Sequence, residues 1–377
     1  MTFDASIAPT RRTVIAGLAL AASPLVSIGE AVATAAPRDR FVRPAGAKPI
    51  IGPDPNATFY CPMRKGPVRW RALHAFNPAA AVHDGSVYLL FRAEDDSGDM
   101  QIGGHTSRIG LARSSDGLNF EALPSPVIYP AEDDQRAAEW DGGCEDPRLA
   151  MREDGTFVCT YTQYNRKAVR LGVATSKDLI FWTKHGSAFA GTRHAEMMMK
   201  SAAIVQRLVE GRLVAAKIGG RYWMLFGQGK IYAATSEDLI RWVPVETAPG
   251  VLKVVMAPRP GRFDSALAEA GPSPIWTPRG IVMLYNGRNA AKGGDTARPA
   301  LEYAAGRVLL DPRDPTRVLE RADAPFLAPE LPWERTGQYA AGTTFIEGLV
   351  PLGREWLLYY GSADSVVGMA RAPGLNV

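Results

Sequence analysis

The chain has 377 residues, of which 46% are hydrophobic and 22% charged, and its formal net charge is +4. This composition is typical of a globular protein with enough apolar material for a core. Basic and acidic residues are mixed along the chain, which argues against a nucleic-acid-binding protein, because such proteins concentrate their positive charge.

The first 36 residues have the order of an export signal. Arg11 and Arg12 precede an uncharged stretch over residues 14–29, and small residues follow at 31–35. This order indicates a signal peptide, and the paired arginines favour the twin-arginine route. The alternative is a short membrane anchor, but the stretch is shorter than the roughly 20 apolar residues of a span. We expect a cleaved signal, no span after cleavage, and a periplasmic or secreted protein.

A short phrase recurs after this signal. Residues 109–116, 171–178 and 231–238 resemble one another, and weaker copies begin at 301 and 366. The phrases begin 62, 60, 70 and 65 residues apart. Repeats of this length are typical of proteins built from one structural unit many times.

Each phrase follows a run rich in aromatic and aliphatic residues, which is typical of a β-strand. The runs cover residues 87–91, 156–161, 222–226, 281–285 and 356–360. Five units with several short strands each predict an all-β protein, a five-bladed β-propeller over residues 60–377, preceded by a leader at 37–59. A pair of β-sandwiches is the alternative, but it leaves the five similar phrases unexplained.

The strand expected before each run begins with polar residues. These strand starts carry Asn77, Asp146, Lys200, Glu269 and a threonine at 343 or 344. Because the innermost strands of a propeller line its central channel, we expect these side chains to meet in one concave place.

Such a group suits the cleavage of a glycosidic bond, which requires two carboxyl groups. We assign these roles to Asp146 and Glu269, with a separation typical of an inverting pair, about 6.5–9.5 Å. Lys200 or Arg148 is expected to keep Asp146 ionised or to bind an anion. The candidates for substrate binding are Asn77, Arg92, Glu94, Arg148, Tyr164, Lys200, Asn286 and Asp364.

Structural roles are the alternatives for each of these residues. An aspartate before proline often forms a turn, as at Asp146. Lys200 is also compatible with a place on the surface, and Glu269 with a place in a loop.

Cys61, Cys144 and Cys159 are odd in number, so at least one is unpaired. They lack zinc-ligand spacing and the chain has only five histidines, so we expect no metal site and no cofactor.

The segment Gly-Cys-Glu-Asp-Pro-Arg at residues 143–148 resembles glycoside hydrolase family 130, which comprises β-mannoside phosphorylases and β-1,2-mannosidases. The resemblance covers about residues 70–370. It includes the segments at 77–78, 88–94, 200–203, 271–272, 284–287, 310–315 and 359–364. It implies a five-bladed propeller and a proton donor at Asp146 that acts through a hydroxyl of the sugar.

Within this family the resemblance favours hydrolysis. Lys200, Arg193 and His194 lie near positions where phosphorylases bind phosphate, but the usual His-Arg-Pro segment is replaced by residues 226–229, Phe-Gly-Gln-Gly. The segment that carries Glu269 resembles the hydrolase branch of the family, and export of the protein agrees with hydrolysis. We expect an inverting hydrolase of β-mannosides, β-1,2-linked manno-oligosaccharides in particular. The alternatives are a phosphorylase that uses inorganic phosphate and releases mannose 1-phosphate, and a non-catalytic sugar-binding propeller.

Overall fold

A computed structural model describes residues 40–375, so the expected signal peptide lies outside the described residues. The fold is all-β, as predicted: 47% of the structure is strand and 2% helix. The two short helices are α1 (Arg136–Glu139) and the 3-10 helix η1 (Pro332–Arg335). Over residues 40–375, no helix is long and apolar enough to cross a membrane.

The first half of the chain forms two antiparallel meanders that share one sheet. They are joined by a single parallel pair, Ser107 with Gly143. The first meander contains β3 (His74–His83), β4 (Ser86–Glu94), β5 (Ser107–Ser114) and β6 (Glu121–Ala122). The second contains β7 (Gly143–Met151), β8 (Phe157–Tyr164), β9 (Val169–Ser176) and β10 (Thr183–Ser187). A hairpin of β1 (Phe59–Cys61) and β2 (Gly66–Val68) precedes them.

The second half continues with further meanders. One contains β11 (Ala202–Ile204), β14 (Lys217–Ile218), β15 (Arg221–Phe226), β17 (Ile231–Ser236), β18 (Val243–Pro244) and β21 (Val254–Met256). The next contains β12 (Gln206–Val209), β13 (Arg212–Ala215), β16 (Gln228–Gly229), β22 (Leu267–Ala270), β23 (Ile275–Thr277), β24 (Gly280–Arg288), β25 (Tyr303–Leu310) and β26 (Val318–Arg321). The last contains β27 (Phe345–Leu352), β28 (Glu355–Ser362) and β29 (Val366–Ala372), and a small hairpin pairs β19 (Glu246–Ala248) with β20 (Val251–Leu252).

The repeated phrases end in the same turn. In the second copy, the Asp178 carboxylate accepts hydrogen bonds from the backbone amides of Ile180 and Phe181, at 2.9 and 2.8 Å. The hydroxyl of Ser176 accepts one from Leu179 at 2.9 Å. Aspartate and serine favour such turns because their short side chains bond the backbone nearby. These residues therefore have a structural role in each repeat.

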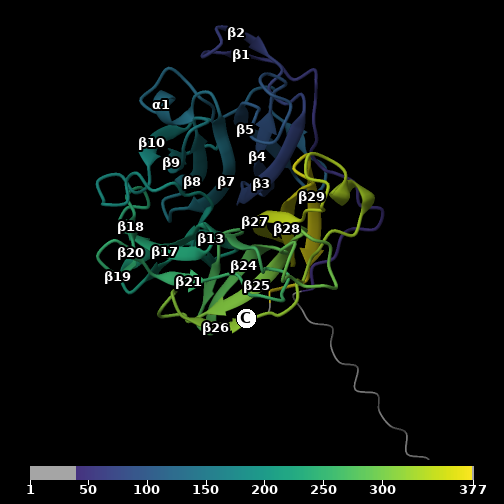
Figure 1. Cartoon of the computed structure of the whole chain (residues 1–377). Helices are drawn as coiled ribbons and strands as arrows, with labels where there is room; N and C mark the ends of the chain where they lie inside the picture. Colours follow the sequence, from purple (N-terminus) through teal and green to yellow (C-terminus); the bar gives the residue numbers. More distant parts are fainter. Residues whose placement is uncertain (1–39, 376–377) are drawn as a thin grey trace, which may run out of the picture. The chain divides into compact units, whose positions relative to one another are not determined.

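The apolar core lies between neighbouring sheets. Leu225 of β15 and Ile231 of β17 belong to the same buried cluster as Met283 of β24 and Val308 of β25. Each sheet thus buries a face against the next, which brings strands distant in sequence together. In particular β3, β7 and β27, from three meanders, contact one another near the centre of the picture (Figure 1).

The segment expected as a leader packs onto the last sheet. The amide of Val42 donates to the carbonyl of Arg371 at 2.8 Å, and the amide of Val367 donates to the carbonyl of Ile51 at 2.8 Å. Arg43 also binds buried Glu334 at 2.6 Å. The folded region therefore begins before residue 60, and this segment borders β29.

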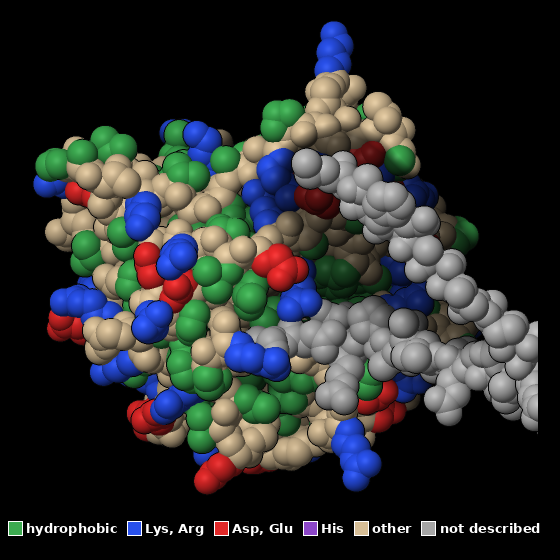
Figure 2. Space-filling model, turned by 90° about the horizontal axis from the view of Figure 1, so that it is seen from below, with side chains coloured by type: hydrophobic (Ala, Val, Ile, Leu, Met, Phe, Trp, Pro, Cys, Tyr) green, Lys and Arg blue, Asp and Glu red, His purple; other side chains and the backbone are tan. Residues whose placement is uncertain are grey.

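Charged side chains of both signs are mixed over one face of the surface, and the cysteines are unpaired. Basic and acidic side chains alternate over the face shown in Figure 2. Cys61, Cys144 and Cys159 are buried and free, so the possible disulfide between the last two is not formed. Cys144 lies opposite Gln163 in the β7–β8 ladder, whereas Cys159 lies opposite Leu149, which separates the two along the sheet.

Candidate active site

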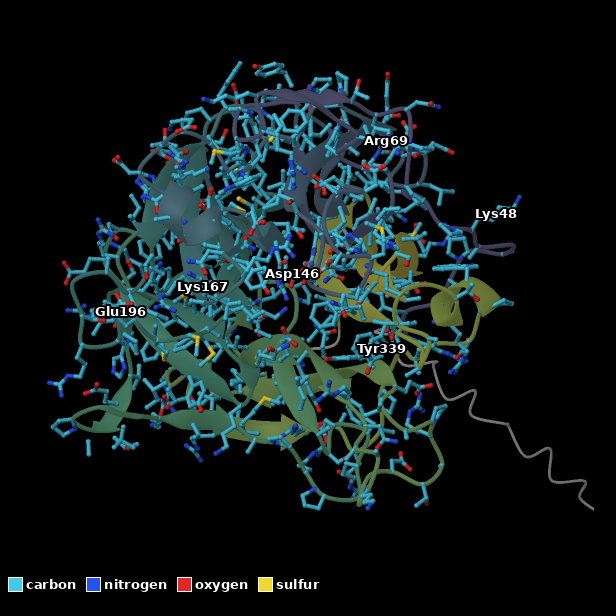
Figure 3. The ribbon with its side chains drawn as sticks, turned by 45° about the horizontal axis from the view of Figure 1, so that its top comes forward. Lys48, Arg69, Asp146, Lys167, Glu196 and Tyr339 are labelled. Atoms are coloured by element: carbon cyan, nitrogen blue, oxygen red, sulfur yellow. The ribbon has the colours of Figure 1, made fainter. Side chains whose placement is uncertain are left out.

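A cavity of about 440 Å³ lies where the inner strands of several meanders meet. Its walls combine carboxylates, cations and aromatic rings. Asp146 lies in the interior, whereas Lys48, Arg69 and Glu196 lie at the outside (Figure 3). The lining residues are Phe76, Asn77, Arg92, Ile102, Gly103, Glu145, Asp146, Tyr164, Val169, Lys200, Gln228, Glu269, Arg288, Tyr303, Tyr339, Thr343, Phe345 and Asp364.

Two of these side chains stand on equivalent irregularities of the inner strands. Asn77 interrupts the β3–β4 ladder and Asp146 the β7–β8 ladder, and both have positive φ, 48° and 46°. Asn and Asp tolerate this backbone conformation better than most residues, and a bulge redirects a side chain. A proline follows each of them and removes a donor from the disrupted ladder. The local sequence thus explains why the two side chains leave the regular alternation of their strands.

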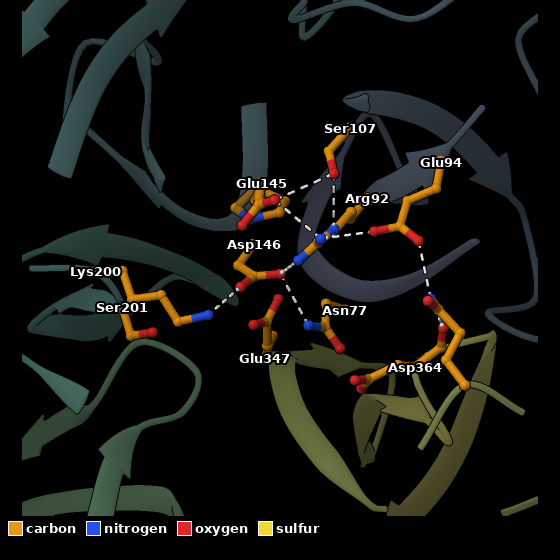
Figure 4. Close-up of polar contacts among 12 residues, drawn as sticks. Asn77, Arg92, Glu94, Ser107, Glu145, Asp146, Lys200, Ser201, Glu347 and Asp364 are labelled. Carbon is orange, nitrogen blue, oxygen red and sulfur yellow. Dashed lines mark hydrogen bonds and ion pairs between the residues drawn. The ribbon is translucent and has the colours of Figure 1, made fainter. Parts of the chain in front are cut away.

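Asp146 is surrounded by donors (Figure 4). Its Oδ1 accepts hydrogen bonds from Asn77 Nδ2 at 2.9 Å and from Arg92 at 3.3 Å. Its Oδ2 accepts one from Lys200 Nζ at 2.8 Å. Burial alone would raise the pKa of Asp146, but Lys200, Arg92 and the Asn77 amide outweigh it and hold that pKa well below its usual range. Asp146 is therefore ionised in the open cavity.

Neighbouring carboxyl groups behave in the opposite way. Burial raises the pKa of Glu145, with Arg92 opposing the shift. Burial also raises the pKa of Asp364 to about 7, again against the attraction of Arg92. The cavity therefore combines Asp146, whose pKa is held low, with Glu145 and Asp364, whose pKa values burial raises.

Glu269 is fully buried on β22 and receives only neutral donors. The Ser201 hydroxyl donates to its Oε1, and Gln228 Nε2 lies 3.4 Å from its Oε2. Ser201 directly follows Lys200, which bonds Asp146. Lys200 and Ser201 are consecutive, and each contacts one predicted catalytic carboxyl group: Asp146 on β7 and Glu269 on β22.

Arg92 connects further acidic side chains. It lies 2.6 Å from Glu94 and 2.9 Å from Glu145, in addition to Asp146. Glu94 is buried behind the cavity wall and accepts a second hydrogen bond from Gln338 at 2.9 Å. Glu94 thus positions Arg92 and does not itself line the cavity.

Two more of the predicted binding residues, besides Glu94, lie outside the cavity wall. Asn286 is fully buried, and its amide bonds both the carbonyl and the amide of Ile346, at 3.0 and 2.8 Å. Arg148 donates to the carbonyls of Ala270 and Gly271, both at 2.9 Å, and pairs with Glu347. Both side chains bond backbone groups of other strands, and in this structure neither lines the cavity.

The other predicted residues line the cavity: Asn77, Arg92, Tyr164, Lys200 and Asp364, together with Asp146 and Glu269. The site residues predicted from the sequence did not include Glu145, Gln228, Arg288, Tyr303 and Tyr339, which line the cavity too. Glu145 directly precedes Asp146, and Tyr303 lies in a repeated phrase, so the sequence carried a signal for these two. Tyr339 lies in a connection without repeat character, and only the fold brings it here.

Comparison with known proteins agrees with this site. The profile of glycoside hydrolase family 130, described as β-1,4-mannooligosaccharide phosphorylase, matches residues 46–376. The chain belongs to glycoside hydrolase family 130. The family resemblance of residues 143–148 is thereby confirmed, and Asp146 lies in that segment.

Individual members of family 130 cover nearly the whole folded region. A 1,2-β-oligomannan phosphorylase from Thermoanaerobacter sp. is 32% identical over 82% of this chain and 93% of its own length. A glycosyl hydrolase structure from Bacteroides ovatus is 48% identical over 88% of this chain and 92% of that one, with a TM-score of 0.86.

A further solved structure is 50% identical, covers 88% of this chain and 93% of its own, and has a TM-score of 0.86. It is described under the statement that this family of mannoside phosphorylases contains glycoside hydrolases that target β-1,2-mannosidic linkages in Candida mannan. Solved relatives at this identity and a curated phosphorylase thus both match this family 130 chain, which makes it a member of a mannoside-active enzyme family.

Proposed function

We propose that this family 130 enzyme hydrolyses β-mannosides by inversion, with β-1,2-linked manno-oligosaccharides as its substrates. The observation that carries the proposal is the pair of buried carboxyl groups, Asp146 and Glu269, that line one cavity. Their surroundings differ: Asp146 receives two cationic donors, whereas Glu269 receives a hydroxyl and an amide. Different surroundings are what a pair of carboxyl groups needs for separate acid and base roles.

Glu269 acts as the base in this proposal. Ser201 and Gln228 orient its carboxylate without neutralising it, so it retains the capacity to accept a proton from water. Water attacking the anomeric carbon from the face opposite the leaving group would give the inverted product.

Asp146 delivers the proton to the leaving oxygen. Because Lys200 and Arg92 keep Asp146 ionised at rest, the proton has to be supplied when substrate is bound. Asp364, with its pKa raised to about 7, is a neighbouring source of this proton near neutral pH. A sugar hydroxyl between Asp146 and the glycosidic oxygen would complete the transfer, as the family resemblance implies.

The charges of the cavity favour water over phosphate as the attacking group. Four carboxyl groups line it, Glu145, Asp146, Glu269 and Asp364, against three cations, Arg92, Lys200 and Arg288. Arg92 and Lys200 are already paired with carboxylates of the cavity. A phosphate dianion would therefore compete with Asp146 and Glu145 for these two cations, whereas an uncharged water would not.

Phosphorolysis is the second candidate, and the 32% identical phosphorylase supports it. Arg193 and His194, expected near a phosphate site, instead contact Glu246 and lie outside the cavity. Arg288 is the lining cation best placed for a phosphate, because it stands over the Tyr303 ring at 5.6 Å and its Nε is buried without a hydrogen-bond partner among residues 40–375.

We further propose that the meanders are the five blades of a propeller around this cavity. The contacts among β3, β7 and β27 and the five repeated phrases support this arrangement. The signal-like residues 1–36 support export to the periplasm or the medium, where a hydrolase product remains useful as free sugar.

The test is turnover of β-1,2-mannobiose in phosphate-free buffer and in buffer with phosphate. We expect mannose in both buffers at equal rates and no mannose 1-phosphate. Strict dependence on phosphate, with mannose 1-phosphate as product, would replace hydrolysis by phosphorolysis. Saturable binding of the disaccharide without turnover in either buffer would instead indicate a sugar-binding protein.

A further inference from the structure

Two histidines that line a second cavity form a cluster with a buried glutamate near the active site. The ligand atoms of His74, His105 and Glu94 all lie within 4.8 Å of one another. They come from separate segments: His74 begins β3, Glu94 ends β4, and His105 lies in the connection to β5. His74 and His105 line a cavity of about 240 Å³ together with Leu73, Met100, Gln101, Ile102 and Gln338.

The two imidazoles have nitrogen atoms without partners. Nδ1 of His74 and Nδ1 of His105 are buried and accept or donate no hydrogen bond among residues 40–375. His105 is only 3% exposed, so solvent does not satisfy this atom. A buried polar atom without a partner costs about 1–3 kcal/mol, and two such atoms on clustered histidines that line one cavity indicate a missing ligand.

Glu94 has room for a further ligand. Arg92 approaches its Oε1 at 2.6 Å and Gln338 its Oε2 at 2.9 Å. Each carboxylate oxygen offers two lone pairs, so one remains on each oxygen. These two contacts also fix the orientation of the carboxylate, as the outer-shell partners of metal ligands usually do.

From this cluster we propose that His74, His105 and Glu94 bind one divalent transition-metal ion, with Zn²⁺ the best match. Two imidazoles and one carboxylate are a common set of ligands for Zn²⁺, which leaves a fourth position open to water. Ligands at about 2.0–2.2 Å from Zn²⁺ lie roughly 3.5 Å apart, so small side-chain rotations bring these three atoms into range.

The ion would be connected to Asp146 through two residues, Glu94 and Arg92. Glu94 binds Arg92, and Arg92 lies 3.3 Å from the Asp146 carboxylate. Ile102 lines both cavities. An ion on Glu94 would therefore hold the inner wall in place, and this positioning role is independent of whether the reaction is hydrolysis or phosphorolysis.

The experiment measures metal binding directly. The purified chain is stripped with a chelator, and Zn²⁺ is titrated by calorimetry, with Co²⁺ as a spectroscopic probe of the coordination number. We expect one ion per chain. His74→Gln and His105→Gln should each weaken binding by more than about 100-fold, because loss of a direct ligand exceeds the usual effect of an outer-shell partner. His185→Gln is the matched control, since His185 contacts Thr175 outside the cluster.

Thermal unfolding distinguishes a lost site from a misfolded variant. Zn²⁺ should raise the unfolding midpoint of the wild type and of His185→Gln, because it binds only the folded state, and should leave that of His105→Gln unchanged. The proposal is overturned if the wild type shows no saturable binding, or if a folded His105→Gln variant binds Zn²⁺ as tightly as the wild type.

Discussion

The ammonium of Lys200 lies 2.8 Å from the carboxylate of Asp146, although 54 residues separate them in the chain. This contact keeps Asp146 charged in the open cavity and ties the start of one meander to the bulge of another. The charge of Asp146 therefore depends on the cations around it, Lys200 and Arg92.

Asp146→Asn should reduce turnover of β-1,2-mannobiose by about 10²–10⁴-fold, because that is the usual contribution of a general acid. Steady-state kinetics measures this loss, and circular dichroism checks the fold. Asp154→Asn is the control, since Asp154 bonds the amide of Thr156 in a turn outside the cavity. Turnover of Asp146→Asn close to that of the control would remove Asp146 from the mechanism.

Glu269→Ala should abolish hydrolysis, because no other group would accept the proton of the attacking water. Added azide should restore cleavage and give the α-mannosyl azide, since the anion needs no base and attacks from the same face as water. Product anomers are assigned by nuclear magnetic resonance. Ser201→Ala removes one hydrogen bond to Glu269 and should cost only about tenfold. A β-configured azide would contradict inversion.

Asp364 should make the stability of the protein depend on pH. Its pKa is raised to about 7 in the fold, against about 3.9 in an unfolded chain, so the folded state binds the proton more tightly. The free energy of unfolding contributed by Asp364 is fully present below pH of about 3.9 and is lost as the pH rises through about 7. Urea unfolding at several pH values measures this slope.

The matched variant is Asp364→Asn, which cannot ionise. We expect its free energy of unfolding to vary less between pH of about 4 and 7 than that of the wild type. An identical slope in the two proteins would show that Asp364 does not titrate in this range.

Asn286→Ala should destabilise the fold without removing a substrate contact. Its side chain bonds both the carbonyl and the amide of Ile346, and each orphaned group costs about 1–3 kcal/mol. Asn77→Ala is the comparison, because Asn77 lines the cavity. We expect Asn286→Ala to lower the urea midpoint and leave KM near the wild-type value, whereas Asn77→Ala raises KM or lowers kcat. A large rise of KM in a folded Asn286→Ala variant would restore its predicted substrate contact.

The all-β fold could be predicted from the repeats, because strand propensity and turn residues act over a few neighbouring positions. Asp178, for example, bonds amides two and three residues ahead, and its phrase recurs at Asp116 and Asp238. The strands expected around Asp146 and Glu269 are present as β7 and β22.

What the sequence determined by itself is therefore the family, the strand-rich architecture and several of the polar residues that line the cavity. Only the tertiary structure decided which polar side chains face the cavity. Arg148 and Asn286 carry the same functional groups as cavity residues, yet they bond backbone groups of other strands. Tyr339, Glu94 and the two histidines acquire their neighbours from distant segments. Contacts of this kind depend on how sheets pack, and no local pattern of residues encodes them.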